Sequence, residues 1–451
     1  MESARGLIAE SSEGPGVATP SYIYSPLSED GNIRLLRLLP NQDYHAPIQC
    51  EIFEYPLRKL NRGPHLYEAL SYVWGSEENQ QPIWIQSNRR LSVTWNLHVA
   101  LLHLRNPFFD RILWVDAICI NQDPAEREKG HQVQMMADIY ANANRVVVWL
   151  GEASADSDIA FDALKGAARG KFMKLDEEED LEDVQKKAPG ESLEERRAVF
   201  AVLERPWFQR IWVVQEVGVA RRILMKCGSS ELEGFVFCSG LSAMNLPYDT
   251  HPDLQALILP ITNLIRDEIF RPPQDSGQQV ASSLRTHTLA ELVDLYHTRK
   301  AAKCVDKIYA LLSISSDFSD NPEQSGLLVD YQASQDAVLE SFTRLSLSPE
   351  MSVRVWDESG FAVIQGPGHI LGRITEVKQG HSRDDVQNIV ITWGKTALLS
   401  KRSGKDLTAS RHQLQVTAKL VCEGDLVCLA KGGARPLIIR LFDNHAAIIR
   451  I

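Results

Sequence analysis

Apolar residues in the first half of the chain form short runs that alternate with amphipathic segments. The run at 112–115 is entirely apolar, which is typical of a strand buried in a parallel sheet. Strands are expected at residues 33–38, 50–55, 66–72, 83–85, 91–93, 112–115, 145–150 and 222–227. Helices are expected after Thr94, after Asp123, and at 157–168, 193–203 and 206–217. This alternation predicts an α/β fold with a doubly wound parallel sheet.

The second half of the chain has a different pattern. Residues 240–345 are mainly of helical period, and short apolar runs from residue 350 onward predict strands at 361–365, 414–418, 425–430, 436–442 and 446–451. A dense acidic run falls within 174–197, where a solvated surface insertion is the simplest interpretation. The expected organisation is a flexible N-terminus at 1–20, an α/β unit at 21–230 that carries the insertion, a helical region at 231–349 and a β-rich unit at 350–451.

Composition narrows the class of protein. The 451 residues carry a formal net charge of -11, so a phosphate-neutralising surface for nucleic acid is not expected. The seven cysteines are widely spaced and include no CxxC pair, which favours reduced thiols in a cytoplasmic protein and argues against a zinc site. No uncharged apolar run approaches the roughly 18 residues that span a bilayer, and no signal peptide is apparent.

Polar side chains follow two of the expected strands, and ligands of doubly wound sheets bind beyond such strand ends. Ser71, Tyr72, Trp74 and Gly75 follow the first of these strands, and Asp116, with Asn121 and Gln122, follows the other. The alternatives are that Asp116 only caps a turn and that Gly75 only closes one.

The predicted helix at 206–217 adds a carboxylate. Phe208, Trp212 and Glu216 are spaced four residues apart, so on a continuous helix they share one face. A carboxylate beside aromatic rings loses hydration, which favours its neutral form and suits acid–base work or the stabilisation of positive charge. Two alternatives remain open: the rings are core residues, and Glu216 pairs with Arg210, Arg221 or Arg222.

Several familiar chemistries are absent from the sequence. It contains no GxxxxGK[ST] phosphate loop, no GxGxxG fingerprint and no GxSxG nucleophile elbow. Cys119 has no evident histidine partner and is expected to be a small buried residue.

Four longer blocks carry a more specific signal. They are YEALSYVWG at 67–75, LWVDAICINQ at 113–122 with the helix and strand that follow it, the stretch from Arg205 to Glu216, and a downstream pair, DKIYALL at 306–312 and GDLVC at 424–428. In these blocks the chain resembles the fungal heterokaryon incompatibility (HET) family from about residue 20 to its C-terminus. The family's β region usually continues further past the Gly-Asp pair, so a short C-terminal unit is expected here.

The resemblance implies a function in fungal non-self recognition and programmed cell death. HET domains are similar to the TIR fold, a flavodoxin-like α/β sheet, and many TIR domains hydrolyse NAD with one glutamate near an aromatic residue. Carried over to this sequence, Glu216 is the catalytic carboxylate and Trp212 a wall of the site. Ser71 and Asp116 line the pocket, and Trp74 stacks on a ring. NAD is then a substrate, and no cofactor is expected.

The resemblance also allows an interpretation without catalysis. A TIR-like adaptor acts through protein–protein contacts, and Glu216 is then structural. The expected partner is a protein from an incompatibility locus or a second copy of the chain. A third interpretation is a regulator whose HET blocks are relics, in which case overexpression leaves fungal growth unharmed.

Overall fold

The computed structural model describes most of the chain. The described residues are 20–57, 65–86, 88–123, 127–176, 192–248, 252–266, 287–317, 327–355, 362–379, 386–394, 409–415, 420–442 and 446–450. Residues 1–19 of the expected flexible N-terminus, residues 177–191 of the acidic insertion and the predicted helix start at Pro124 lie outside these ranges.

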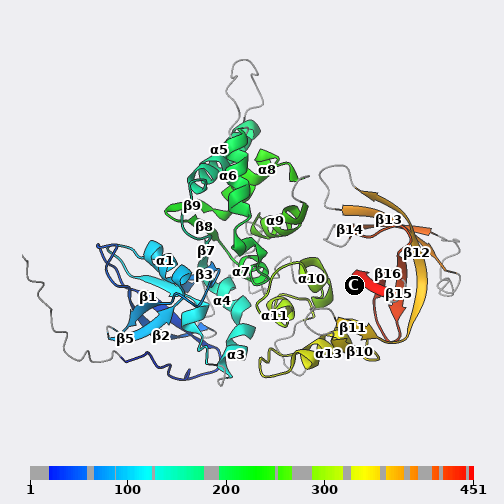
Figure 1. The fold of residues 1–451 in the computed structure, drawn as a ribbon, viewed down its shortest axis with the longest axis horizontal. Helices are drawn as coiled ribbons and strands as arrows, with labels where there is room; N and C mark the ends of the chain where they lie inside the picture. The colour runs from blue at the N-terminus through cyan, green and yellow to red at the C-terminus, as the bar shows by residue number, and fades with distance from the viewer. Residues whose placement is uncertain are drawn as a thin grey trace, which may run out of the picture.

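The first part of the chain folds around a nine-stranded sheet (Figure 1). Its strands are β1 (Asn32–Leu38), β2 (Gln49–Pro56), β3 (His65–Tyr72), β4 (Gln81–Ile85), β5 (Arg89–Val93), β6 (Arg111–Trp114), β7 (Ala143–Trp149), β8 (Ile223–Cys227) and β9 (Ser230–Glu233). Their spatial order is β5-β4-β2-β1-β6-β3-β7-β8-β9.

The sheet is mixed, so the parallel sheet that the sequence pattern predicts forms only part of it. Its centre, β6-β3-β7-β8, is parallel. On the flanks β1 pairs antiparallel with both β2 and β6, β4 with β5, and β8 with β9. The physical reason is the shortness of several connections, because a parallel pair needs a crossover of a dozen or more residues. The α/β class is nevertheless confirmed.

Helices follow the strands as the sequence pattern predicts, with two interruptions. They are α1 (Trp95–Leu104), α2 (Asp116–Cys119), α3 (Glu128–Gln134), α4 (Met136–Asn142), α5 (Ser157–Asp176), α6 (Leu193–Leu203), the 3-10 helix η2 (Pro206–Gln209), α7 (Val213–Gly218), α8 (Gly234–Met244), α9 (Pro252–Arg266), α10 (Leu289–Tyr296), α11 (Asp306–Leu312) and α13 (Gln335–Ser346). Thr94 caps α1 as predicted. The helix expected to reach Tyr140 is divided into α3 and α4 at Met135. Of the described helices, none combines the length and apolarity of a membrane-spanning segment.

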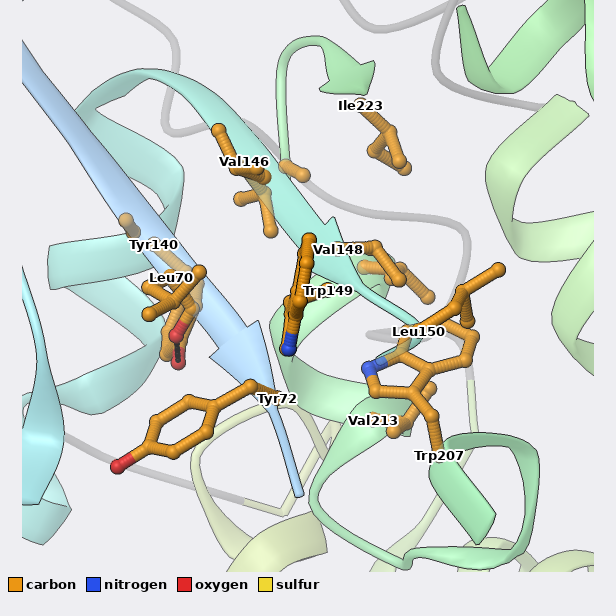
Figure 2. Packing of buried hydrophobic residues seen from close by; sticks show 14 of the residues in the cluster. Leu70, Tyr72, Tyr140, Val146, Val148, Trp149, Leu150, Trp207, Val213 and Ile223 are labelled. Atoms are coloured by element: carbon orange, nitrogen blue, oxygen red, sulfur yellow. Dashed lines mark hydrogen bonds between the residues drawn. The ribbon is translucent and has the colours of Figure 1, made fainter. Parts of the chain in front are cut away.

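One hydrophobic core joins the sheet to the helices that pack against it. Trp114, Trp149 and Trp207 are its largest fully buried side chains. Figure 2 shows Trp149 at the end of β7 above Trp207, whose indole nitrogen faces the end of β3. The core therefore extends to the carboxyl ends of the parallel strands, where the polar candidate residues lie.

The C-terminal part is a separate β-rich layer, as predicted (Figure 1). It contains the hairpin β10 (Ser352–Val355) with β11 (Ala362–Gln365), and a six-stranded antiparallel sheet in the order β14-β13-β12-β15-β16-β17. Those six strands are β12 (Gly368–Gln379), β13 (Val386–Trp393), β14 (Ala409–Gln415), β15 (Leu426–Ala430), β16 (Pro436–Leu441) and β17 (Ala446–Arg450). The prediction missed β10, β12 and β13, and the strand predicted at 414–418 overlaps only the last two residues of β14. Arg435 attaches this layer to α10, donating to Glu291 at 2.7 Å and to Thr288 at 3.1 Å.

Candidate functional site

The segment that carries Glu216 is a broken helix, because a distant part of the chain pairs with it. Arg210, after η2, has an extended backbone. It forms a parallel bridge with Lys300: the Lys300 amide donates to Gln209 O at 2.6 Å and the Ile211 amide to Lys300 O at 2.9 Å. The expectation that Phe208, Trp212 and Glu216 share one helical face is therefore wrong. Phe208 lies in the core, and α7 begins at Val213.

Glu216 lies at the carboxyl end of β3. Its side chain is 1% exposed and accepts a short hydrogen bond from the Ser71 hydroxyl. The same hydroxyl accepts from the Trp207 indole N–H at 2.7 Å. Two Arg210 nitrogens donate to the carboxylate at 3.0 and 3.2 Å. The indole that is hydrogen-bonded to this network is therefore that of Trp207. Trp212 only accepts a hydrogen bond from the Glu216 backbone N–H with its carbonyl oxygen.

Asp116 is held beside this group at the end of β6. It occupies the first turn of the short helix α2, and its carboxylate accepts from the Trp74 indole at 2.8 Å and from the Ala117 amide at 2.8 Å. The buried Tyr72 hydroxyl has no hydrogen-bond partner of regular geometry among the described residues. Asp116 is nevertheless near enough to contribute, after burial, to a raised pKa of Tyr72. A buried hydroxyl of this kind is a polar group with unused bonding capacity.

Burial sets the electrostatics of the two carboxyl groups. It raises the pKa of Glu216, against the opposing effects of Arg210 and the Ser71 hydroxyl. It also raises the pKa of Asp116, against the Trp74 hydrogen bond and Arg210. Burial lowers the pKa of Arg210, but Glu216 and Asp116 outweigh this effect, and the pKa lies above its ordinary value. One guanidinium therefore balances two carboxyl groups.

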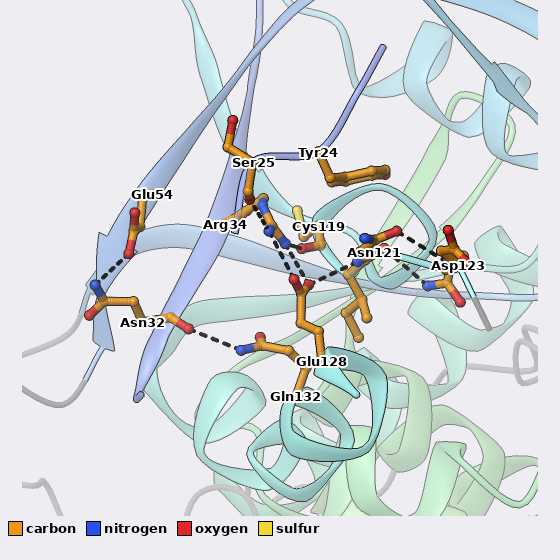
Figure 3. Close-up of polar contacts among 12 residues, drawn as sticks. Tyr24, Ser25, Asn32, Arg34, Glu54, Cys119, Asn121, Asp123, Glu128 and Gln132 are labelled. Atoms are coloured by element: carbon orange, nitrogen blue, oxygen red, sulfur yellow. Dashed lines mark hydrogen bonds and ion pairs between the residues drawn. The ribbon is translucent and has the colours of Figure 1, made fainter. Parts of the chain in front are cut away.

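Asn121 and Gln122 hold the loop that carries Asp116. The Asn121 backbone N–H donates to Glu128 at 2.9 Å, and Glu128 is ion-paired with the buried Arg34 at 2.5 Å (Figure 3). Gln122 donates to the Asp116 carbonyl at 3.0 Å and accepts from Lys129 at 3.1 Å. The structure therefore gives the Asn121 backbone and the Gln122 side chain a positioning role next to Asp116.

Asn96 supports the other loop, and the sequence analysis missed it. It donates to Val73 O at 2.5 Å and accepts from the Trp149 indole at 3.1 Å, which ties the loop after β3 to the end of β7. Gly75 has φ +81, a backbone conformation that favours glycine, and lies over the Asn96 side chain. An asparagine in the first turn of a helix gives no sequence signal for this role.

Most of the predicted residues meet at the strand ends. Ser71 contacts Glu216, and Trp74 contacts Asp116. The Tyr72 side chain is buried next to Ser71 in the chain. Gly75, with its positive φ, shapes the exposed loop that follows. Two hollows elsewhere contain none of these residues: one of about 430 Å³ beside Arg34 and one of about 290 Å³ beside Tyr309. Within the described ranges no group of three or more His, Cys, Asp or Glu side chains is arranged to hold a metal ion.

Comparisons with known proteins cover the same residues. The model of the family described as heterokaryon incompatibility protein (HET) matches residues 67–216, which include both strand ends and Glu216. Heterokaryon incompatibility protein 6, OR allele, of Neurospora crassa is 30% identical over 360 residues, which are 70% of this chain and 51% of that protein. The chain thus spans about half the length of this relative. No solved structure matches the chain significantly.

Proposed function

Because this chain belongs to the heterokaryon incompatibility (HET) family, we propose that it acts as an effector of fungal non-self recognition and programmed cell death. The site at the ends of β3 and β6 is the part that acts. Its trigger is a protein from an incompatibility locus or a second copy of the chain, and it operates in the cytoplasm.

The order of the central strands supports a doubly wound, TIR- or flavodoxin-like arrangement. The sequence of parallel strands in space is β6-β3-β7-β8, so the first strand along the chain lies between the second and the third. Sheets with this order bind ligands beyond the strand ends where the order reverses, which here is between β3 and β7. Ser71, which pairs with Val148 across these two strands, lies at that point.

The proposed chemistry is hydrolysis of NAD, and the placement of Glu216 is the observation that carries it. The bond between ribose C1′ and the nicotinamide nitrogen breaks, and its electron pair leaves with neutral nicotinamide. The ribose becomes an oxocarbenium-like centre, whose positive charge a nearby carboxylate stabilises. Water then adds to C1′ and gives up a proton, and the product is ADP-ribose.

Named residues supply each part of this step. Glu216 offsets the charge on the ribose, and Ser71 and Arg210 favour its ionised form. Trp74 offers an aromatic surface, held by Asp116. The Arg210 side chain is 18% exposed and covers Glu216, so the substrate enters on its side of the site.

A second candidate function is a non-enzymatic adaptor, and one observation favours it. Glu216 is almost fully buried and paired with Arg210, which is how a structural ion pair looks. In this case the HET surface recruits a partner, and the charge of Glu216 serves only folding.

The two candidates are separated by nicotinamide release from NAD by the purified protein. Glu216→Gln is expected to lower kcat by about 100-fold or more, as the loss of a transition-state contact does. The matched control is Glu68→Gln, because Glu68 is a buried carboxylate of the same strand as Ser71, paired with Arg111 and Arg145. Glu68→Gln is expected to retain the wild-type activity per folded molecule. Thermal unfolding measures the fraction of the variant that is folded.

Two results would refute hydrolysis: no release by the wild type, or equal release by Glu216→Gln. Expression of both proteins in a fungal host, with viability and NAD measured together, tests the biological function. An adaptor kills equally well with Gln at position 216 and leaves NAD unchanged.

A further inference from the structure

Two lysine ammonium groups lie over one tyrosine ring next to the strand-end site. Lys129 Nζ is 5.4 Å and Lys303 Nζ 5.0 Å from the centroid of Tyr331. Lys129 Nζ also lies 5.9 Å from the Trp74 ring. In the part of the chain that the structure describes, neither ammonium group forms a direct ion pair with a carboxylate.

The backbone fixes this arrangement from two sides. A Cβ at Gly130 would lie 2.8 Å from the carbonyl oxygen of Val329, so only glycine lets α3 approach the segment before Tyr331 this closely. Asp306 accepts from the Tyr331 hydroxyl at 2.9 Å and from the Lys303 amide at 3.3 Å. The Tyr331 ring and the backbone at both lysines are therefore held in place independently of any ligand.

Side-chain contacts lead from the lysine pair toward Glu216. Lys129 lies over Trp74, and Trp74 donates to Asp116. Arg210 is ion-paired with Glu216, and Asp116 is near enough to raise the pKa of Arg210. A line of alternating aromatic and charged groups thus extends from the end of β3 to a part of the chain outside the family match.

The outer end of this line holds two lysines and the single carboxyl group of Asp306, so its net charge is positive. Burial lowers the pKa of Lys129, and the positive charge of Lys303 lowers that pKa further. The carboxyl groups of Asp306 and Asp116 act in the opposite direction. Two ammonium groups beside one carboxyl group leave an excess of positive charge next to the Tyr331 ring, which favours a further anion there. Lysine is a regular phosphate ligand that acts as a point charge.

We propose that Lys129 and Lys303 form a diphosphate subsite, which binds the pyrophosphate of a dinucleotide whose ribose lies at Glu216. The inference rests on the proposed hydrolysis of NAD and specifies how its substrate is held. It assigns a ligand contact to Lys303, and a supporting role to Tyr331, both from the region after the matched residues 67–216.

The test is calorimetric titration of the full-length protein with ADP-ribose and with adenosine. ADP-ribose contains the diphosphate but no nicotinamide bond, so its binding does not depend on hydrolysis. Lys303→Gln is expected to weaken ADP-ribose binding about tenfold, which corresponds to 1.4 kcal/mol, and to leave adenosine binding unchanged. Lys165→Gln, an exposed position on α5, makes the same change of charge and is expected to change neither affinity.

Each outcome decides one of the two proposals. Unchanged ADP-ribose affinity in Lys303→Gln, an equal loss for adenosine, or no binding of ADP-ribose by the wild type overturns the subsite. If binding depends on Lys303 but NAD releases no nicotinamide, the subsite stands and hydrolysis falls. If nicotinamide is released and Lys303→Gln leaves KM unchanged, hydrolysis stands and the subsite falls.

Discussion

Arg210 is the residue on which the local charge balance depends. Its guanidinium pairs with Glu216 at 3.0 Å, and its pKa is raised by Asp116 as well. The sequence suggested Arg210 only as one of three arginines that could pair with Glu216. The bend that brings it back over Glu216, six positions away, follows from the extended backbone at residue 210.

The two carboxyl groups make stability depend on pH. Burial raises the pKa of both Glu216 and Asp116 in the folded state above the ordinary values of 4.5 and 3.8. The folded protein then keeps these protons to a higher pH than the unfolded chain does. Their contribution to stability is complete below the ordinary values and is lost as pH rises through the raised ones.

Urea unfolding of the wild type and of Asp116→Asn/Glu216→Gln at stepped pH measures this effect. The free energy of unfolding of the wild type, relative to the variant, is expected to fall as pH rises from about 4. A difference that stays constant, or grows with pH, contradicts the assignment of raised pKa values.

At the scale of elements, the loop after β3 is shaped by one glycine. Gly75→Ala places a side chain at φ +81, where nothing closer than 3.5 Å obstructs it, so the cost is that of the backbone alone. We expect a loss of about 1–2 kcal/mol in the free energy of unfolding. Gly170→Ala is the control, because Gly170 lies within α5 with open space around it, and a gain of about 0.5–1 kcal/mol is expected. Equal effects of the two substitutions on denaturant unfolding contradict this.

Local patterns predicted those elements that depend only on neighbouring residues. Thr94 caps α1, and Ser192 forms a capping box with Glu195 at the start of α6. The stretch 206–217 was predicted wrongly because its helical period is real, but pairing with Lys300 overrides it. Information about that pairing lies far along the chain, and no local rule includes it.

The candidate site could be predicted as a location more readily than as a geometry. The strand-end rule selected Ser71 and Asp116, which the structure places next to Glu216 and Trp74. The same rule is silent about Asn96, which contacts the site loop only because α1 packs beside it. It is equally silent about Lys303, whose position depends on how the helical region folds back onto α3.

At the scale of the whole molecule, polar contacts join three parts of the chain. Arg435 joins the C-terminal sheet to α10, and Lys300 joins the helical region to the segment before Glu216. The second of these contacts determines the position of Arg210. It consists of main-chain hydrogen bonds, so it is insensitive to the identity of the exposed Lys300 side chain.

Substitution of Lys300 by proline and by alanine tests this contact. Proline removes the amide that donates to Gln209 O at 2.6 Å, whereas alanine keeps it. Hydrogen exchange of a peptide covering 206–216 is expected to speed up in Lys300→Pro and to remain as in the wild type in Lys300→Ala. The cost in stability is about 1–3 kcal/mol for the proline variant. Similar exchange in both variants contradicts a role for the bridge.

The Lys300 bridge also limits how far the matched segment can be treated as a transferable cassette. Residues 67–216 alone contain Glu216 and Arg210 but not the main-chain partner that bends the segment between them. Grafted onto another scaffold, that stretch is free to wind into the continuous helix that its own sequence favours, and Arg210 then turns away from the carboxylate. A protein engineered from this domain therefore has to include the segment around Lys300 as well.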